Sequence, residues 1–255
     1  MKTRILQVFA VLLLSQSLFA GPVDTFYRSI RVAFSYSPAI FPLEWQQSPI
    51  SGEASIIENG ERMRCKLLTI KALDKYPADV LKLNLKSVYW LKKMSFYGVE
   101  YGGTNSNSAV YLTNDGANLG YTDNYLEQTF HHEFSSILFR NYPSLFDSVA
   151  WKAVNEKNFI YNDPEDGVGA IRNNASSQDL DTAICRRGLL TQYSMSSIEN
   201  DVNTFAQNLF AASEGFWDLM TKYPRIRMKV YILIRFYNKI NPLFTEQYFR
   251  RISNN

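Results

Sequence analysis

A long amphipathic segment, residues 123–140, carries both histidines of this 255-residue chain. The two histidines are adjacent and a glutamate follows them, as His131-His132-Glu133. A helix turns by about 100° per residue, so it would place His132 and Glu133 on one polar face. Apolar side chains would fill another face and pack on the core: Leu126, Phe130, Phe134 and Ile137. The segment is therefore predicted to be a helix with one buried face and one face that borders a polar cleft.

The same geometry separates the two histidines. His131 falls on the far flank of the core face, one turn after Glu127, a spacing that fits a histidine–carboxylate pair. We therefore predict a partly buried His131 beside Glu127, and His132 alone on the cleft face. Adjacent histidines on a regular helix cannot both reach one metal ion.

His132-Glu133 is also the first half of the H-E-x-x-H signature of zinc peptidases. In that signature two histidines four residues apart bind zinc, and the glutamate polarises the attacking water. Here Ser136 stands in place of the second histidine. A neutral hydroxyl is a weak zinc ligand, so one histidine with weak donors would not hold zinc tightly.

The first 20 residues follow the pattern of a secretory signal peptide. Lys2 and Arg4 form a positive start, an apolar stretch runs to Phe19, and the small residues Ala20 and Gly21 flank a cleavage point. The stretch is short and interrupted by polar residues. A cleaved signal is therefore favoured over a retained anchor, and no stable membrane span is expected after cleavage.

Cleavage would leave residues 21–255, a length that suits a single domain. Loss of the two basic residues would lower the formal net charge from +3 to +1. No basic stripe with interleaved aromatic residues is present, so we expect no nucleic-acid partner. The exported protein would be periplasmic or secreted. There, Cys65 and Cys185 could form a disulfide, and two buried free thiols are the alternative.

The order of elements predicts an α+β fold, in which a small mixed sheet precedes the histidine helix and a mostly helical half follows it. The sheet-containing part would extend to about residue 120. Asp123 is the predicted cap of the histidine helix, and the polar insert 162–179 is predicted to be a solvated loop rather than part of a site. Hydrophobic periodicity and strand-forming composition predict strands at 87–91 and 109–113, and helices at 63–76, 77–83, 199–216, 226–240 and 243–252.

Three further segments occur in the same order as in one family of enzymes. A turn with Gly102-Gly103-Thr104 precedes the histidine helix, the segment 188–194 ends in Tyr193-Ser194, and a later helix contains residues 203–207 (Asn-Thr-Phe-Ala-Gln). Over roughly residues 95–215 the chain resembles the bacterial zinc-binding metallopeptidases of the zincin or gluzincin type, and more distantly the catalytic domain of anthrax lethal factor. The resemblance implies a zincin-like fold, a hydrolase activity on protein or peptide substrates, and zinc.

That family reads H-E-F-x-H on the active-site helix, has a tyrosine near the metal, and draws its carboxylate ligand from the later helix. Carried over by position, the resemblance implies that His132 binds metal, that Glu133 is the general base and that Tyr193 stabilises the oxyanion. Three other family positions are neutral in this chain: Ser136, Asn203 and Gln207. No separate cofactor-binding residues are implied.

Three interpretations remain open. The protein is an exported zinc-dependent metallopeptidase with an atypical site, in which Glu199 or Asp201 replaces the lost carboxylate beside His132. Alternatively, the metal site is degenerate and the protein is a non-catalytic binding protein of the cell envelope, with a protein or peptide partner. In the third interpretation the domain is unrelated, and the His-Glu pair arose by chance.

Overall fold

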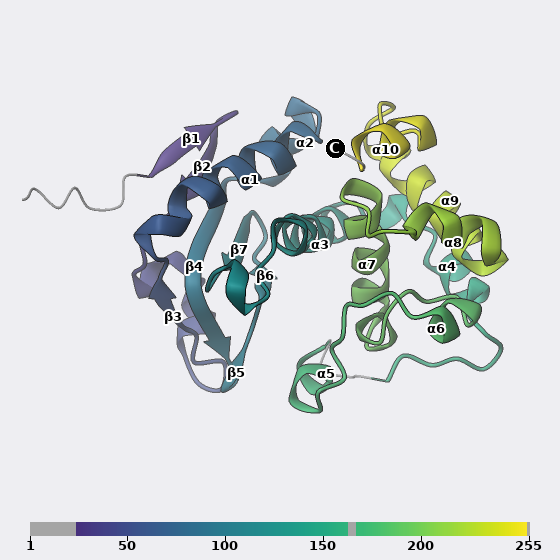
Figure 1. Cartoon of the computed structure of the whole chain (residues 1–255), viewed down its shortest axis with the longest axis horizontal. Coiled ribbons are helices and arrows are strands. Elements are labelled where there is room, and N and C mark those ends of the chain that lie inside the picture. Colours follow the sequence, from purple (N-terminus) through teal and green to yellow (C-terminus); the bar gives the residue numbers. More distant parts are fainter. Residues whose placement is uncertain (1–23, 163–166, 254–255) are drawn as a thin grey trace, which may run out of the picture.

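The computed structural model describes residues 24–162 and 167–253 (Figure 1). The predicted signal peptide lies outside the described residues. A mixed sheet forms one half of the molecule, and helices form the other half. Helix α3 (Asp123–Asn141) lies between them and contacts both the sheet and α7 (Ile198–Phe210). The predicted order, with a mixed sheet first and a mostly helical part after it, is confirmed.

The sheet has seven strands among the described residues. Strands β2, β4 and β7 run parallel to one another, and the other strand pairs are antiparallel. The main order is β1-β2-β4-β7-β6, which makes β6 an end strand, while β3 and β5 also pair with β4. The strand bounds are β1 Thr25–Tyr27, β2 Ile30–Ala33, β3 Glu53–Ile56, β4 Ser87–Phe96, β5 Val99–Glu100, β6 Gly103–Asn105 and β7 Ala109–Thr113.

Both predicted strands are present. The strand predicted at 109–113 is β7, and all five of its residues are buried, as expected for a strand inside a sheet with both faces covered. The strand predicted at 87–91 is longer than expected, because β4 continues to Phe96 and pairs there with β5 in a hairpin. Tyr97 and Gly98 form the turn, both with positive φ.

Most of the remaining α-helices lie on the far side of α3 from the sheet (Figure 1). Their bounds are α1 Arg62–Asp74, α2 Ala78–Asn84, α4 Ser148–Val154, α5 Val168–Arg172, α6 Thr182–Arg186, α8 Phe216–Lys222, α9 Pro224–Ile240 and α10 Glu246–Ile252. The five helices predicted from periodicity are all present. The prediction for 199–216 extended too far, because α7 ends at Phe210. Asn208 Oδ1 accepts a hydrogen bond from the Ser213 amide and holds the chain in a turn there.

The cap of α3 is Thr122 rather than Asp123. Thr122 Oγ1 accepts a hydrogen bond from the Tyr125 amide at 3.2 Å, which is the usual role of an N-cap side chain. Asp123 instead accepts a hydrogen bond from Arg64 Nε at 2.6 Å. The prediction of Asp123 as the cap is therefore wrong, and its carboxylate is in an ion pair with Arg64 of α1.

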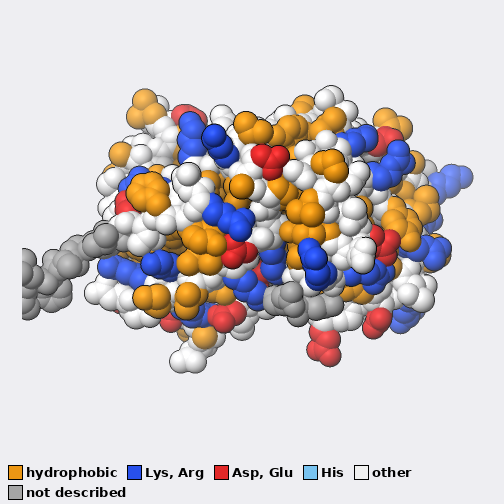
Figure 2. All heavy atoms as spheres, turned by 90° about the horizontal axis from the view of Figure 1, so that it is seen from above, with side chains coloured by type: hydrophobic (Ala, Val, Ile, Leu, Met, Phe, Trp, Pro, Cys, Tyr) orange, Lys and Arg blue, Asp and Glu red, His pale blue; other side chains and the backbone are white. Residues whose placement is uncertain are grey.

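Cys65 and Cys185 are buried free thiols, so the structure contains no Cys65–Cys185 disulfide. Burial raises the pKa of Cys65 to about 12 and that of Cys185 to about 11. Both thiols are therefore protonated and poorly reactive at neutral pH. No helix within the described residues is long and apolar enough to cross a membrane. Figure 2 shows basic and acidic side chains interspersed on the visible face.

Candidate functional site

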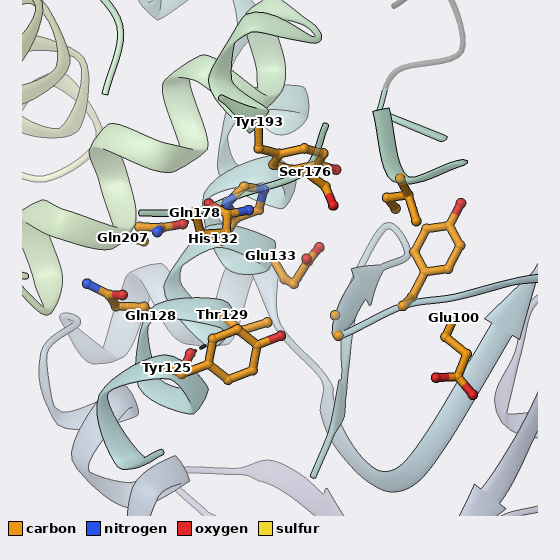
Figure 3. A pocket seen from close by; sticks show the side chains of 14 residues that line it. Glu100, Tyr125, Gln128, Thr129, His132, Glu133, Ser176, Gln178, Tyr193 and Gln207 are labelled. Carbon is orange, nitrogen blue, oxygen red and sulfur yellow. Dashed lines mark hydrogen bonds between the residues drawn. The ribbon is translucent and has the colours of Figure 1, made fainter. Parts of the chain in front are cut away.

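The polar face of α3 lines a pocket of about 180 Å³. Figure 3 shows His132, Glu133 and Tyr193 around this pocket, with Gln207 next to His132. Side chains from α3, α7, the segment before β6 and the polar insert meet there. The lining residues are Glu100, Tyr101, Gly102, Gly103, Tyr125, Gln128, Thr129, His132, Glu133, Ile171, Ser176, Gln178, Tyr193 and Gln207.

His132 lies between Gln207 of α7 and the ring of Tyr193. Its Nδ1 lies 2.9 Å from Gln207 Oε1. An amide oxygen only accepts, so His132 Nδ1 donates in this hydrogen bond. The Tyr193 ring stacks on the imidazole, with ring centroids 6.0 Å apart. The structure therefore brings His132, Tyr193 and Gln207 together.

Glu133 points toward the end strand of the sheet. Its Oε2 accepts a hydrogen bond from Asn105 Nδ2 at 2.6 Å, and burial raises its pKa. A Cβ at Gly103 would lie 2.8 Å from Glu133 Oε1 and 2.5 Å from Thr129 Cγ2. Glycine at this position thus lets β6 lie directly against α3, which places Asn105 within reach of the carboxylate.

Ser136 and Asn203 are paired with each other. Asn203 Nδ2 donates to Ser136 Oγ at 2.6 Å, across the α3–α7 interface. Both residues are buried, Asn203 fully. Asn203 Oδ1 is buried and has no hydrogen-bond partner within the described residues. The two positions at which the resemblance expects a histidine and a carboxylate are thus adjacent in space, and a neutral hydrogen bond joins them.

Neither acidic residue of α7 replaces the lost carboxylate. The Glu199 carboxylate lies 2.8 Å from Arg140 Nη1 in an ion pair, and Arg140 Nη2 also donates to Asn105. Asp201 faces away from Asn203, because two residues along a helix turn by about 200°. It is fully buried against Lys229. The alternative that Asp201 serves beside His132 is therefore wrong, and Glu199 is engaged by a cation.

The donor chemistry does not fit tight zinc binding. Zinc in proteins takes thiolate, imidazole and carboxylate ligands, whereas His132 is surrounded by a hydroxyl and two amides that are already hydrogen-bonded. Among residues 24–162 and 167–253, no group of three or more His, Cys, Asp and Glu side chains is placed to hold a metal ion. Of the two residues predicted to bind metal, His132 borders the pocket and Glu199 is paired with Arg140.

The polar insert contributes to the pocket, which corrects the prediction that it is only a solvated loop. Ser176 and Gln178 line the pocket, and so does Ile171 on the short helix α5. Asn105, the partner of Glu133, was also missed. The glycines before it gave a signal, since consecutive glycines permit the close approach of a strand to a helix.

His131 is the buried histidine predicted beside Glu127. It is fully buried, its Nδ1 lies 2.9 Å from the Tyr76 hydroxyl, and its ring stacks on Phe210. Its Nε2 lies 3.7 Å from Glu127 Oε1, and Lys75 Nζ lies 2.5 Å from the same oxygen. Burial lowers the pKa of His131 to about 4, against a smaller opposing effect of Glu127.

This depressed pKa predicts acid sensitivity. Below its ordinary pKa of 6.5, His131 takes up a proton in the unfolded chain but not in the folded one, so stability falls as the pH drops from 6.5 toward 4. Between about pH 7 and about pH 5 the loss should be about 2 kcal/mol. Urea unfolding at the two pH values measures it. The variant His131→Asn should lose less stability over the same pH interval. If it loses as much as the unmodified chain, His131 is not the cause of the acid sensitivity.

Comparisons with known proteins give one distant likeness. No protein-family model matches the chain, and no curated protein matches it. The fold is similar to the crystal structure of a "putative zinc-binding metallo-peptidase" from Bacteroides caccae. The identity is 17%, the TM-score is 0.46, and the alignment covers 74% of this chain and 76% of that chain. A likeness at this level assigns no function to the present chain.

Proposed function

We propose that this chain is a non-catalytic, metallopeptidase-like binding protein, exported to the cell envelope, which binds a peptide segment in the pocket beside His132. One observation carries the proposal: a hydrogen bond joins Ser136 and Asn203, the positions that the resemblance assigns to the second and third metal ligands, and Gln207 is hydrogen-bonded to His132. Here three neutral residues pair with one another and with the remaining histidine.

The position of the end strand favours a peptide as the ligand. Among the described residues, strand β6 pairs with β7 alone, and Gly103 of β6 also lines the pocket. An extended peptide can add to such an edge through main-chain hydrogen bonds, while its side chains enter neighbouring pockets. The proposed ligand is therefore an extended segment of a protein or peptide that presents a side chain to His132 and Glu133.

The alternative is a zinc-dependent metallopeptidase with a rearranged site. In that case His132 would bind zinc, Glu133 would activate water and Tyr193 would hold the oxyanion. The observation in its favour is the orientation of His132, since a hydrogen bond at Nδ1 leaves Nε2 as the side of the ring that could bind metal.

Metal analysis of the purified chain distinguishes the binding protein from the zinc-dependent metallopeptidase. We expect a zinc content far below one per chain after dialysis against a weak chelator, and an unchanged melting temperature when a strong chelator is added, because no metal contributes to stability. About one zinc per chain that is lost in His132→Ala would overturn the binding proposal and support the peptidase.

A further inference from the structure

Acidic side chains outnumber lysine and arginine among the described residues that line the pocket beside His132. Two carboxylates line it, Glu133 on α3 and Glu100 at the rim, and no Lys or Arg is among the described lining residues. Glu133 is 9% exposed, whereas the Glu100 side chain is 72% exposed and pairs at 3.4 Å with Lys93. The inner part of the pocket therefore depends on Glu133 for its charge. A buried carboxylate is stabilised by a cation that enters beside it.

Two carbonyl-type oxygens at the pocket, on Gln178 and Glu133, receive no hydrogen bond from the protein within the described residues. Gln178 Oε1 is buried and has no hydrogen-bond partner within the described residues. In Glu133, Asn105 occupies only Oε2. Buried acceptors without donors are costly, so a ligand that donates several hydrogen bonds would satisfy groups that the protein leaves unmatched.

Aromatic rings complete the pocket. Tyr101, Tyr125 and Tyr193 all line it, and Figure 3 shows Tyr125 and Tyr193 on opposite sides of Glu133. A cation that lies over an aromatic face is attracted by the electrons of the ring, and sites for alkylammonium groups commonly combine several rings with a carboxylate. The cavity of about 180 Å³ is smaller than the roughly 300–1,000 Å³ of pockets that enclose a small molecule. It therefore suits one side chain or chain end.

We propose that this pocket recognises the primary ammonium group of a peptide, which Glu133, Gln178 and the surrounding tyrosines would bind. The ammonium group has three donors and a positive charge, which matches both the acceptors and the carboxylate. The inference rests on the proposed binding function and names the chemistry of its ligand. Two sources carry this group, a lysine side chain and a free peptide N-terminus.

Four short peptides test the inference by isothermal titration calorimetry on the full chain. They are acetyl-Gly-Lys-Gly-amide, its norleucine analogue, its Nε-acetyl-lysine analogue, and Gly-Gly-Gly-amide with a free N-terminus. We expect the lysine peptide to bind at least about tenfold more tightly than the two neutral analogues. Tighter binding of the free N-terminus than of the lysine peptide would assign the same pocket to a chain end. Equal binding of all four, or of none, would overturn the ammonium inference.

Two matched variants test whether the affinity for the ammonium peptide depends on Glu133. Glu133→Gln keeps an oxygen for Asn105 but removes the charge, and it should weaken binding of the ammonium peptide by about tenfold or more. Glu44→Gln makes the same change at an exposed residue outside this pocket and should leave the affinity unchanged. Equal losses in both variants would overturn the assignment to this pocket. If the norleucine peptide binds as well as the lysine peptide, the ammonium inference fails and the binding function stands. The binding function itself fails if the metal analysis finds stoichiometric zinc.

Discussion

A double variant, Ser136→His with Asn203→Glu, is expected to bind about one zinc ion per chain, whereas the unmodified chain binds far less. The reason is the observed geometry. Ser136 lies one helical turn after His132 on the polar face of α3, and Asn203 on α7 is within hydrogen-bond distance of it. The two substitutions would place two imidazoles and one carboxylate around one point, the ligand set of catalytic zinc sites. Each added ligand of the right chemistry should tighten binding by roughly tenfold or more.

Zinc content after dialysis, together with competition against a chromophoric chelator, measures the gain. The control carries His132→Ala in addition to the two substitutions and should lose the metal again, since His132 supplies the first ligand. The single variant Ser136→His should bind more weakly than the double variant. Absence of zinc from a double variant that remains folded would show that positions 132, 136 and 203 do not converge, contrary to the structure described here.

Local patterns in the sequence were sufficient to predict much of the fold. Hydrophobic periodicity located the helices now seen as α1, α3, α7 and α9, because each has an apolar face that packs on the core. Helix geometry also separated His131 from His132 correctly. The sequence predicted less well which of two neighbouring residues takes a given structural role. Thr122 and Asp123 are both good caps, and the choice between them depends on Arg64, which lies far away in the sequence.

The sequence predicted some residues of the candidate site but not their hydrogen-bond partners, because those partners also lie far away in the sequence. His132, Glu133 and Tyr193 were identified as a set, and the structure brings them to one pocket. The partners that define their chemistry come from segments without a motif: Asn105 on the end strand and Gln178 in the polar insert. Asp201 misled the interpretation, because its proximity in sequence to Asn203 does not place it on the same helix face. A pairing with Lys229, 28 residues away, cannot be read from local spacing.

Lys229→Met is expected to lower the free energy of unfolding by about 3–5 kcal/mol. Lys229 and Asp201 are both fully buried, and Lys229 Nζ lies 2.5 Å from Asp201 Oδ2. The Trp151 indole and the Tyr161 hydroxyl donate to the same oxygen, at 2.8 and 2.6 Å. Removal of the cation leaves an uncompensated carboxylate in the core. Burial already raises the pKa of Asp201, an effect that Lys229 opposes, so without Lys229 the group would take up a proton more readily.

Equilibrium urea unfolding measures this loss, and two further variants identify its cause. Lys152→Met makes the same substitution at an exposed lysine on α4, and it should change the free energy by no more than about 0.5 kcal/mol. Asp201→Asn in the Lys229→Met background removes the stranded charge while keeping an oxygen for Trp151 and Tyr161, so it should restore roughly 2 kcal/mol. If the double variant is as unstable as Lys229→Met alone, the loss comes from the packing of the lysine stem. If it recovers, the charge of Asp201 is what requires Lys229 in the core. The ion pair then ties one side of α7 to α9, while Asn203 and Gln207 on the other side contact α3.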